Sequence, residues 1–297
     1  MSHGLVEFFQ QLFNALRVSG VYALVALGIT VIFGLTGIVK FSIGQLITLG
    51  AFLTFSLWDH NRLPYLLAVP VAALTVAALS LFLERAMFRF TLATPINGFI
   101  VSLGLILVLQ NVMVEFWGTQ ARFIRPLFTN VWDAGGVRMP VNDWFTIWVT
   151  VVLIGALLIT LRTTKYGRAM RACAEDREAA ALMGIPVEWV IAGTFALGGL
   201  LAGIAGGMLG SINTINVYLG QSYLLKGFAV ALVGGLGSIE GAVFAAVLVG
   251  TTETMAAGYL QHPEWRDGYT FALMILILII RPTGLFRARG QLQQTLQ

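Results

Sequence analysis

The chain of 297 residues contains few charged residues. Lys, Arg, Asp and Glu together make up 11% of it, against 58% hydrophobic residues, and the mean hydropathy is +0.84. Charges are missing altogether from stretches such as 144–161 and 269–280. A soluble chain of this length could not cover its surface with so few polar groups. The scarcity of charge therefore excludes a water-soluble domain and indicates an integral membrane protein.

Cysteine and histidine are also scarce, which limits the chemistry that the chain can perform. The single cysteine, Cys173, rules out an intrachain disulfide, and the histidines at 3, 60 and 262 form no metal-binding motif. Ser238 has no histidine partner of the kind a serine protease needs. The run 234–237 lacks the preceding strand and the following Lys-Ser/Thr pair of a phosphate loop. We therefore expect no catalytic residues, no metal and no cofactor on this chain.

The net charge is +4, but the basic residues stand between apolar segments instead of forming a patch for nucleic acid. This spacing is typical of loops that obey the positive-inside rule. Residues 1–11 lack the basic start and the cleavage site of a secretory signal. We therefore expect the first apolar helix to remain in the mature protein.

Nine apolar segments approach the roughly 20 residues that a membrane helix needs. The segments at 44–58 and 223–235 are short and bounded by glycine, which is typical of broken or re-entrant helices. The sequence predicts an all-α, polytopic membrane protein with about 8–9 membrane segments, organised as one domain over 1–297. The nine segments are 16–34, 44–58, 64–82, 96–117, 144–161, 190–211, 223–235, 241–259 and 268–280.

The loop between the fifth and sixth segments fixes the expected orientation, because it holds five basic residues within 162–177. We place this loop, 162–188, in the cytoplasm and the polar loop 118–143 outside. Nine membrane passages then put the N-terminus outside, whereas eight would put it inside. Ala, Arg, Glu and Met dominate 167–183 and favour a short amphipathic helix, which Gly184 and Pro186 would end. Composition alone leaves open whether this helix is a solvated connector or a docking element.

The order of residues in this loop resembles a known docking sequence. Glu178-Ala179-Ala180, three further residues and Gly184 match the E-A-A-x-x-x-G loop by which ABC importer permeases bind their ATPases. The flanking Gly167-Arg168-Ala-Met-Arg171-Ala and Leu182-Met-Gly184-Ile are similar to the LivH-type branched-chain amino acid permeases. Other similar segments are Leu83-Glu84-Arg85, Gln110-Asn111, Gly234-Gly235-Leu236-Gly237-Ser238 with Gly241-Ala242, Ala257-Gly258-Tyr259-Leu260, and Arg281-Pro282-x-Gly284-Leu285-Phe286.

This resemblance implies a non-catalytic permease subunit in a bacterial inner membrane that translocates branched-chain amino acids by ATP-driven alternating access. It also implies a second homologous permease, two cytoplasmic ATPases that bind ATP and magnesium, and a periplasmic solute-binding protein. The small alanines would let the helix enter a groove of an ATPase, and the charges around them would set partner choice. The implied ATPase-coupling residues are Arg168, Arg171, Glu175, Asp176, Arg177, Glu178, Ala179, Ala180 and Gly184.

One segment departs from the family pattern. After the first span the family usually reads N-F-A-H-G-acid, whereas this chain has Lys40-Phe41-Ser42-Ile43-Gly44-Gln45. Because we expect this segment to border the pathway, urea, short amides or another small organic solute stay open as substrates. A secondary transporter is the alternative from another class. It would place ionisable groups deep in its spans, where Glu115, Glu253 and Lys226 are the candidates.

Polar side chains within or beside the spans are candidates for the substrate pathway, with hydrogen bonding between helices as the alternative explanation of each. They are Ser42, Gln45, Gln110, Asn111, Asn213, Asn216 and Glu253. A carboxylate within a span costs about 2–3 kcal/mol on insertion scales, so we expect Glu253 to face protein or water. Gly199, Gly203 and Gly207 repeat every four residues and predict close helix packing.

Overall fold

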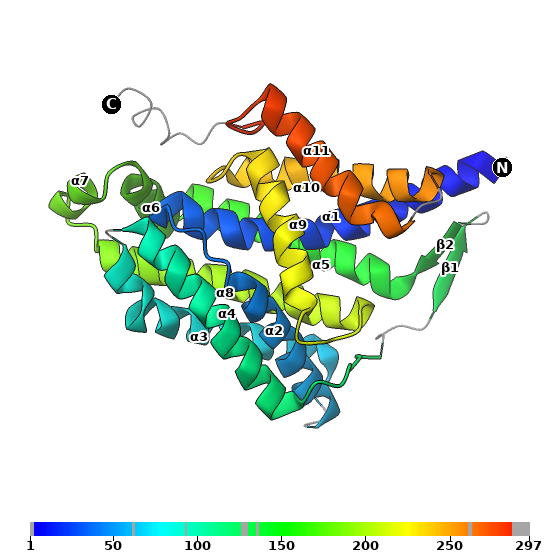
Figure 1. Ribbon diagram of the computed structural model, residues 1–297, viewed down its shortest axis with the longest axis horizontal. Coiled ribbons are helices and arrows are strands. Elements are labelled where there is room, and N and C mark those ends of the chain that lie inside the picture. The colour runs from blue at the N-terminus through cyan, green and yellow to red at the C-terminus, as the bar shows by residue number, and fades with distance from the viewer. Residues whose placement is uncertain are drawn as a thin grey trace.

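The computed structural model describes residues 3–60, 63–92, 94–125, 130–134, 137–260 and 263–286. Within these residues the chain is all-α apart from one small hairpin, as the sequence predicts (Figure 1). The α-helices are α1 (His3–Thr36), α2 (Ile43–Asp59), α3 (Tyr65–Ala86), α4 (Pro95–Trp117), α5 (Val141–Thr163), α6 (Lys165–Glu175), α7 (Arg177–Leu182), α8 (Val187–Ile212), α9 (Leu219–Gly234), α10 (Ile239–Tyr259) and α11 (Arg266–Ile280). The short elements are η1 (Phe88–Thr91), η2 (Pro263–Trp265), β1 (Val131–Ala134) and β2 (Val137–Pro140).

Each of the nine predicted segments corresponds to one helix. Within the described residues, six helices are long and apolar enough to cross a membrane: α1, α3, α4, α5, α8 and α10. Helices α2 and α9, at 17 and 16 residues, are short, as their glycine boundaries predict. Helix α1 begins well before the predicted start at residue 16, and its first turns bury Phe13 while Phe8 and Phe9 stay exposed.

The two ends of α1 lie at opposite ends of the molecule. Near the N-terminus, Gln10 Nε2 donates to the Arg138 carbonyl oxygen over 3.0 Å, and the Arg138 backbone N–H donates to Gln10 Oε1. The last turn of α1 contacts α7 instead, at the end where α6 and α7 lie (Figure 1). The N-terminal end of α1 therefore lies at the end of the bundle that carries the hairpin of β1 and β2.

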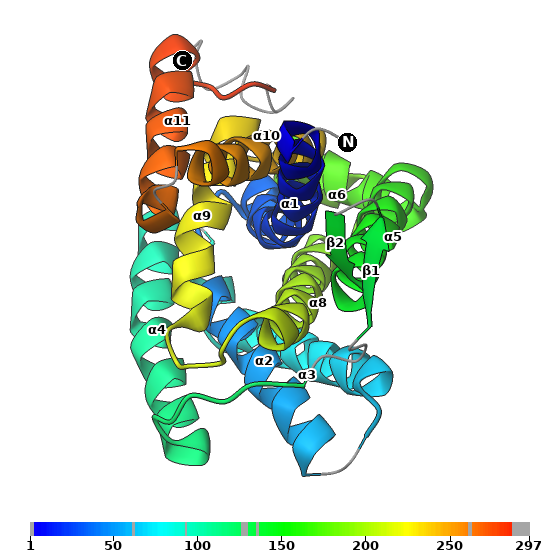
Figure 2. The same cartoon turned by 90° about the vertical axis from the view of Figure 1, so that its right-hand side faces the viewer.

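Helix α8 lies at the centre of the bundle, packed against α1, α2 and α3 (Figure 2). Its glycines permit this approach, as predicted. A Cβ atom on Gly203 would lie 2.6 Å from Ala73 Cα of α3, and one on Gly206 would clash with the Ile47 carbonyl oxygen of α2. Tyr65 of α3 also donates its hydroxyl to the Gly207 carbonyl oxygen over 3.0 Å. Small residues thus bring these helix backbones into direct contact.

Helices α4 and α5 lie at the edge of the bundle. In the apolar 18-residue stretch of each helix, only 17% of the residues of α4 and 22% of those of α5 are buried, against 78% for α1 and α8. At its outer end α4 is attached to α2 by Trp117, whose indole N–H donates to Ser56 Oγ and whose ring stacks on Phe52. Most of the surface of α4 and α5 is therefore left for lipid or for other proteins.

Candidate functional site

The segment 162–188, which the sequence predicts to be cytoplasmic, contains two helices where the sequence predicted one. Helix α6 ends at Glu175, and Asp176 then adopts an extended conformation with φ −153°. Its carboxylate accepts hydrogen bonds from the backbone N–H groups of Glu178 and Ala179, over 2.8 and 3.0 Å, and so caps α7. The prediction of a single helix was wrong because it counted Asp176 as a charged surface residue and overlooked its capping role. Gly184 has φ +80°, the left-handed end that the sequence predicts.

Helix α7 turns one face toward the bundle and the other away from it. Ala180 is buried at 5% exposure, and Arg177 is half-buried. Leu182 and Met183 point away, at 89% and 82% exposure, beside the exposed Glu178 and Ala179. Sequence reasoning missed Leu182 and Met183, although two apolar residues in a charged cytoplasmic loop are themselves a signal of a contact surface.

Helix α6 holds α7 in place. Met170 and Cys173 are buried, and the Tyr166 hydroxyl donates to the Val190 carbonyl oxygen of α8 over 3.0 Å. The Arg171 guanidinium donates to the Leu161 carbonyl oxygen at the end of α5. Of the remaining predicted coupling residues, Arg168, Glu175 and Asp176 are exposed. The predicted set therefore divides into residues that anchor the segment and residues that present a surface.

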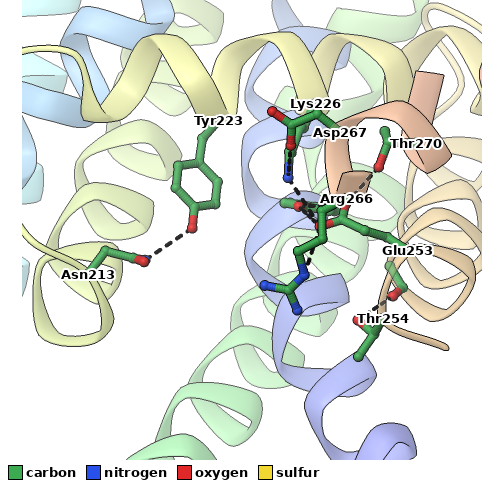
Figure 3. A network of polar contacts seen from close by, with 10 residues as sticks. Asn213, Tyr223, Lys226, Glu253, Thr254, Arg266, Asp267 and Thr270 are labelled. Carbon is green, nitrogen blue, oxygen red and sulfur yellow. Dashed lines mark hydrogen bonds and ion pairs between the residues drawn. The ribbon is translucent and has the colours of Figure 1, made fainter. Parts of the chain in front are cut away.

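A polar cluster surrounds Glu253 of α10, which is 2% exposed (Figure 3). Tyr22 of α1 and Thr270 of α11 donate their hydroxyls to its carboxylate over 2.8 and 2.7 Å, and the Lys226 ammonium of α9 lies 3.1 Å away. Lys226 also pairs with Asp267 over 2.8 Å. The prediction that Glu253 faces protein is confirmed. Because every charge in this cluster has a partner, it joins four helices without the penalty of an unpaired buried ion.

The structure does not bring the other predicted pathway residues together. Ser42 and Gln45 lie inside the bundle at the N-terminal end of α2, and within the described residues Ser42 Oγ and Gln45 Oε1 have no hydrogen-bond partner. Asn213 donates to the Tyr223 hydroxyl over 3.0 Å (Figure 3). Asn216 accepts the Tyr218 backbone N–H over 2.9 Å, which caps the turn before α9. These residues thus occupy separate positions in the fold.

Helix α4 instead presents polar residues on its exposed surface. Asn97, Asn111 and Glu115 are exposed, with Gly104 between them, and the helical period aligns these four positions in one stripe. Gln110, half-buried, lies off this stripe. The Asn111 side-chain amide donates to the Leu107 carbonyl oxygen, a contact within its own helix. Exposed positions in the middle of α5 are all apolar, namely Trp148, Val151, Val152, Ala156 and Ile159.

The described residues form a bundle with six helices long and apolar enough to cross a membrane, and sequence comparison gives the family. The sequence model described as "Branched-chain amino acid transport system / permease component" matches residues 11–278. The chain belongs to this family, and it is a non-catalytic, multi-pass membrane permease of a bacterial ABC transport system.

Individual relatives cover nearly the whole chain. The high-affinity branched-chain amino acid transport system permease LivH of Salmonella typhimurium is 33% identical over 96% of this chain and 97% of that protein. BraD of Pseudomonas aeruginosa, named for the same kind of system, is 30% identical over 95% of this chain and 96% of its own length. The ribose import permease RbsC of Haemophilus influenzae is 24% identical over 92% of this chain and 86% of its own length.

Proposed function

We propose that this permease translocates branched-chain amino acids. Relatives named for such systems match the chain over nearly its full length, and a relative named for ribose matches at lower identity. The departure at Lys40 affects the site less than its sequence suggests, because the Lys40 ammonium is buried against Ser80 Oγ, 3.0 Å away, and over the Phe195 ring. This lysine serves packing inside the bundle and leaves no exposed cation to recognise a solute.

The proposed machine also contains a second permease of this kind, two cytoplasmic ATPases with bound ATP and magnesium, and a solute-binding protein on the outer side. Binding and hydrolysis of ATP would change the distance between the ATPases, and the permeases would follow by alternating between outward-open and inward-open states. No residue of this chain need perform chemistry in that cycle. Its work is to hold a partner, to move and to provide a polar path.

The observation that carries the proposed coupling role is the exposure of Leu182 and Met183 on a capped, anchored helix. Side chains exposed at 89% and 82% on a cytoplasmic helix face water in the isolated chain. A groove in an ATPase would remove both from water, and each fully buried side chain contributes roughly 1.5–3 kcal/mol. Glu178 and Ala179 lie on the same exposed side and complete the docking surface. Ala180, buried in the bundle, supports this surface from behind.

The polar stripe of α4 is the proposed wall of the solute path. Asparagine and glutamate side chains on the exposed surface of a membrane helix are costly against lipid. A second permease that covered α4 would enclose Asn97, Asn111 and Glu115 between the two subunits and provide hydrogen-bonding groups along an apolar path. The apolar exposed face of α5 fits lipid instead.

Uptake in reconstituted vesicles tests the solute. The complete complex should accumulate labelled leucine, and unlabelled isoleucine and valine should compete, whereas urea, acetamide and ribose in equal excess should not. Competition by urea or acetamide but not by valine would replace the proposed substrate with small amides. Uptake by the isolated chain without ATPases or ATP would contradict the ABC mechanism and favour a secondary transporter.

Docking is tested on the membrane-inserted complex. Leu182→Ala with Met183→Ala should release the ATPases during purification, since loss of two buried anchors of about 2 kcal/mol each weakens binding several hundredfold. Lys165→Ala is the matched control, because Lys165 is exposed on α6 and lies outside the docking surface. Full retention of the ATPases by the double variant would remove α7 as the docking element.

A further inference from the structure

The last turn of α1 is joined to α7 by one side chain. Arg177 Nη2 donates to the Leu35 carbonyl oxygen over 2.7 Å, across 142 positions of sequence. The final carbonyls of a helix have no partner within it. In α1 the Gly37 backbone N–H donates to the Phe33 carbonyl oxygen, and the Thr36 hydroxyl donates to the Ile32 carbonyl oxygen. Arg177 donates to the Leu35 carbonyl oxygen, and its positive charge also interacts favourably with the negative C-terminal end of the α1 dipole.

Arg177 faces inward, away from the side on which a partner would dock. Its side chain is half-buried, and desolvation lowers the pKa of its guanidinium from the ordinary value. A partly desolvated cation that donates to a helix-end carbonyl forms a directed contact with fixed geometry. Leu182 and Met183, by contrast, leave the bundle on the other side of α7. The helix therefore carries an attachment to α1 on its inner side and a separate surface for a partner on its outer side.

The end of α1 that Arg177 holds is packed tightly against a second element. A Cβ atom on Gly34 would lie 3.2 Å from Gly237 Cα, in the turn between α9 and α10. The C-terminal segment is bonded to the end of α9 just before that turn, because the backbone N–H groups of Leu285 and Phe286 donate to the carbonyl oxygens of Val233 and Gly234, over 2.8 and 3.1 Å. A displacement of the α1 terminus would therefore reach the cytoplasmic ends of α9, α10 and α11.

Helix α1 also extends through the whole bundle. Its 34 residues span about 51 Å at 1.5 Å per residue. On the way it meets Glu253 through Tyr22, and at the outer end it bonds to the hairpin through Gln10. Because 78% of the residues in its apolar 18-residue stretch are buried, α1 moves only together with the helices that pack against it. Within the described residues, α1 is hydrogen-bonded to α7, to the Glu253 cluster and to the hairpin of β1 and β2.

We infer that Arg177 is the positioning residue that transmits displacement of α7 to α1, and through α1 to the Glu253 cluster and the outer hairpin. This inference rests on the proposed docking of α7 on the ATPases, but it assigns Arg177 to transmission and not to docking. Without the guanidinium, the ATPases would stay bound to Leu182 and Met183 while α7 lost its direct connection to α1. Hydrolysis would then lose its dependence on the loaded binding protein.

The test uses the whole complex in vesicles. Arg177→Gln removes the charge and keeps a polar stem, and Arg177→Met keeps an apolar stem of similar length. For both we expect the wild-type amount of copurified ATPase, basal hydrolysis within about twofold of wild type, and stimulation by loaded binding protein and leucine uptake each lowered about tenfold, the loss expected for a charge-assisted hydrogen bond. Lys165→Gln, which removes a nearby exposed charge, should match wild type in every measurement.

Each other outcome overturns the inference. Wild-type uptake and stimulation in both Arg177 variants would show that the contact transmits nothing. Loss of the ATPases would make Arg177 a docking residue, and failure of both variants to insert would assign it to folding alone. The proposed docking fails in a different way, when the Leu182 and Met183 double variant retains its ATPases, so the two results are distinguishable.

Discussion

Helices α8 and α4 are both long and apolar enough to cross a membrane, yet their surroundings are opposite. In α8, 78% of the residues in the apolar 18-residue stretch are buried, and glycines contact the backbones of α2 and α3 directly. In α4 only 17% is buried, and Asn97, Asn111 and Glu115 lie on the exposed side. In a membrane protein, mean hydropathy therefore does not tell the packed core from the edge. Small residues mark the core, and polar residues mark the place where a protein or water must replace lipid.

The largest expected effect comes from filling a glycine contact of the core. Gly206→Leu places a side chain against the Ile47 carbonyl oxygen, where backbone must move. We expect loss of nearly all folded protein, because overpacking a close backbone contact costs about 3 kcal/mol or more. Gly155→Leu on α5 is the matched change, since nothing lies within 4 Å of its Cβ position. The amount recovered as a single peak by size exclusion in detergent measures both. Equal recovery would mean that α8 is not the packed centre.

The next effect concerns two carboxylates, one in the core and one at the edge. Glu253→Leu leaves Tyr22 and Thr270 without their acceptor and leaves Lys226 with Asp267 alone. Removal of one partner from a buried ion pair typically costs about 3–5 kcal/mol, so we expect a thermal unfolding midpoint several degrees lower. Glu253→Gln keeps an acceptor oxygen and should lose less.

Glu115→Leu is the edge counterpart, because Glu115 is exposed on α4. It should leave the unfolding midpoint of the isolated chain within about a degree of wild type, as exposed substitutions usually cost under 0.5 kcal/mol. A shift as large as that of Glu253→Leu would place Glu115 in the folded core, against the structure.

The sequence predicts the helices better than it predicts their neighbours. Apolar length locates all nine predicted segments, each of which is a helix in the structure, because lipid demands long apolar helices wherever they lie. It does not tell that α5 faces outward while α8 is enclosed, since both are long and apolar, with mean hydropathies of 2.3 and 1.8 over 18 residues. The four-residue spacing of glycines on α8 did predict its close packing against other helices. Of the polar residues chosen for the pathway, Ser42 and Gln45 prove to be internal, and sequence alone has no means of separating them from the exposed Asn111.

The coupling segment shows the same limit on a smaller scale. The E-A-A-x-x-x-G pattern locates α7 and the left-handed Gly184. Which of its residues face outward depends on the break at Asp176, because a continuous helix from 167 to 183 would have turned different side chains to solvent. Arg177 illustrates this, since the sequence groups it with the surface charges whereas the structure attaches it to Leu35. A local sequence pattern could not predict that Arg177 contacts Leu35, because the two residues are 142 positions apart.

A smaller effect, on labelling alone, tests whether the exposed surfaces of α4 and α5 differ. In a Cys173→Ala background, Asn111→Cys should react with a water-soluble thiol reagent, because the polar stripe of α4 would border water in the complex. Val152→Cys, 63% exposed on α5, should stay unreactive in lipid. We expect at least a tenfold difference in labelling rate, since the thiolate that reacts needs water around it. Similar rates at the two positions would retire α4 as the wall of the path.

The smallest expected effect concerns Cys173, which belongs to the packed side of α6 at 2% exposure. Burial raises the pKa of its thiol above the ordinary value, and the nearby Arg177 only partly offsets this. Because a raised pKa lowers the thiolate fraction at every pH below it, alkylation at pH 7 should be slow and should quicken as the pH rises. Cys173→Ala should retain uptake within about twofold, since truncation of so small a side chain costs on the order of 1 kcal/mol. Met183→Cys in that background provides the contrast, because its position is 82% exposed and should label at once in the isolated chain, but slowly when the ATPases are bound. Rapid alkylation of native Cys173 at pH 7 would show that α6 leaves the bundle, and the anchored platform on which α7 depends would then be lost.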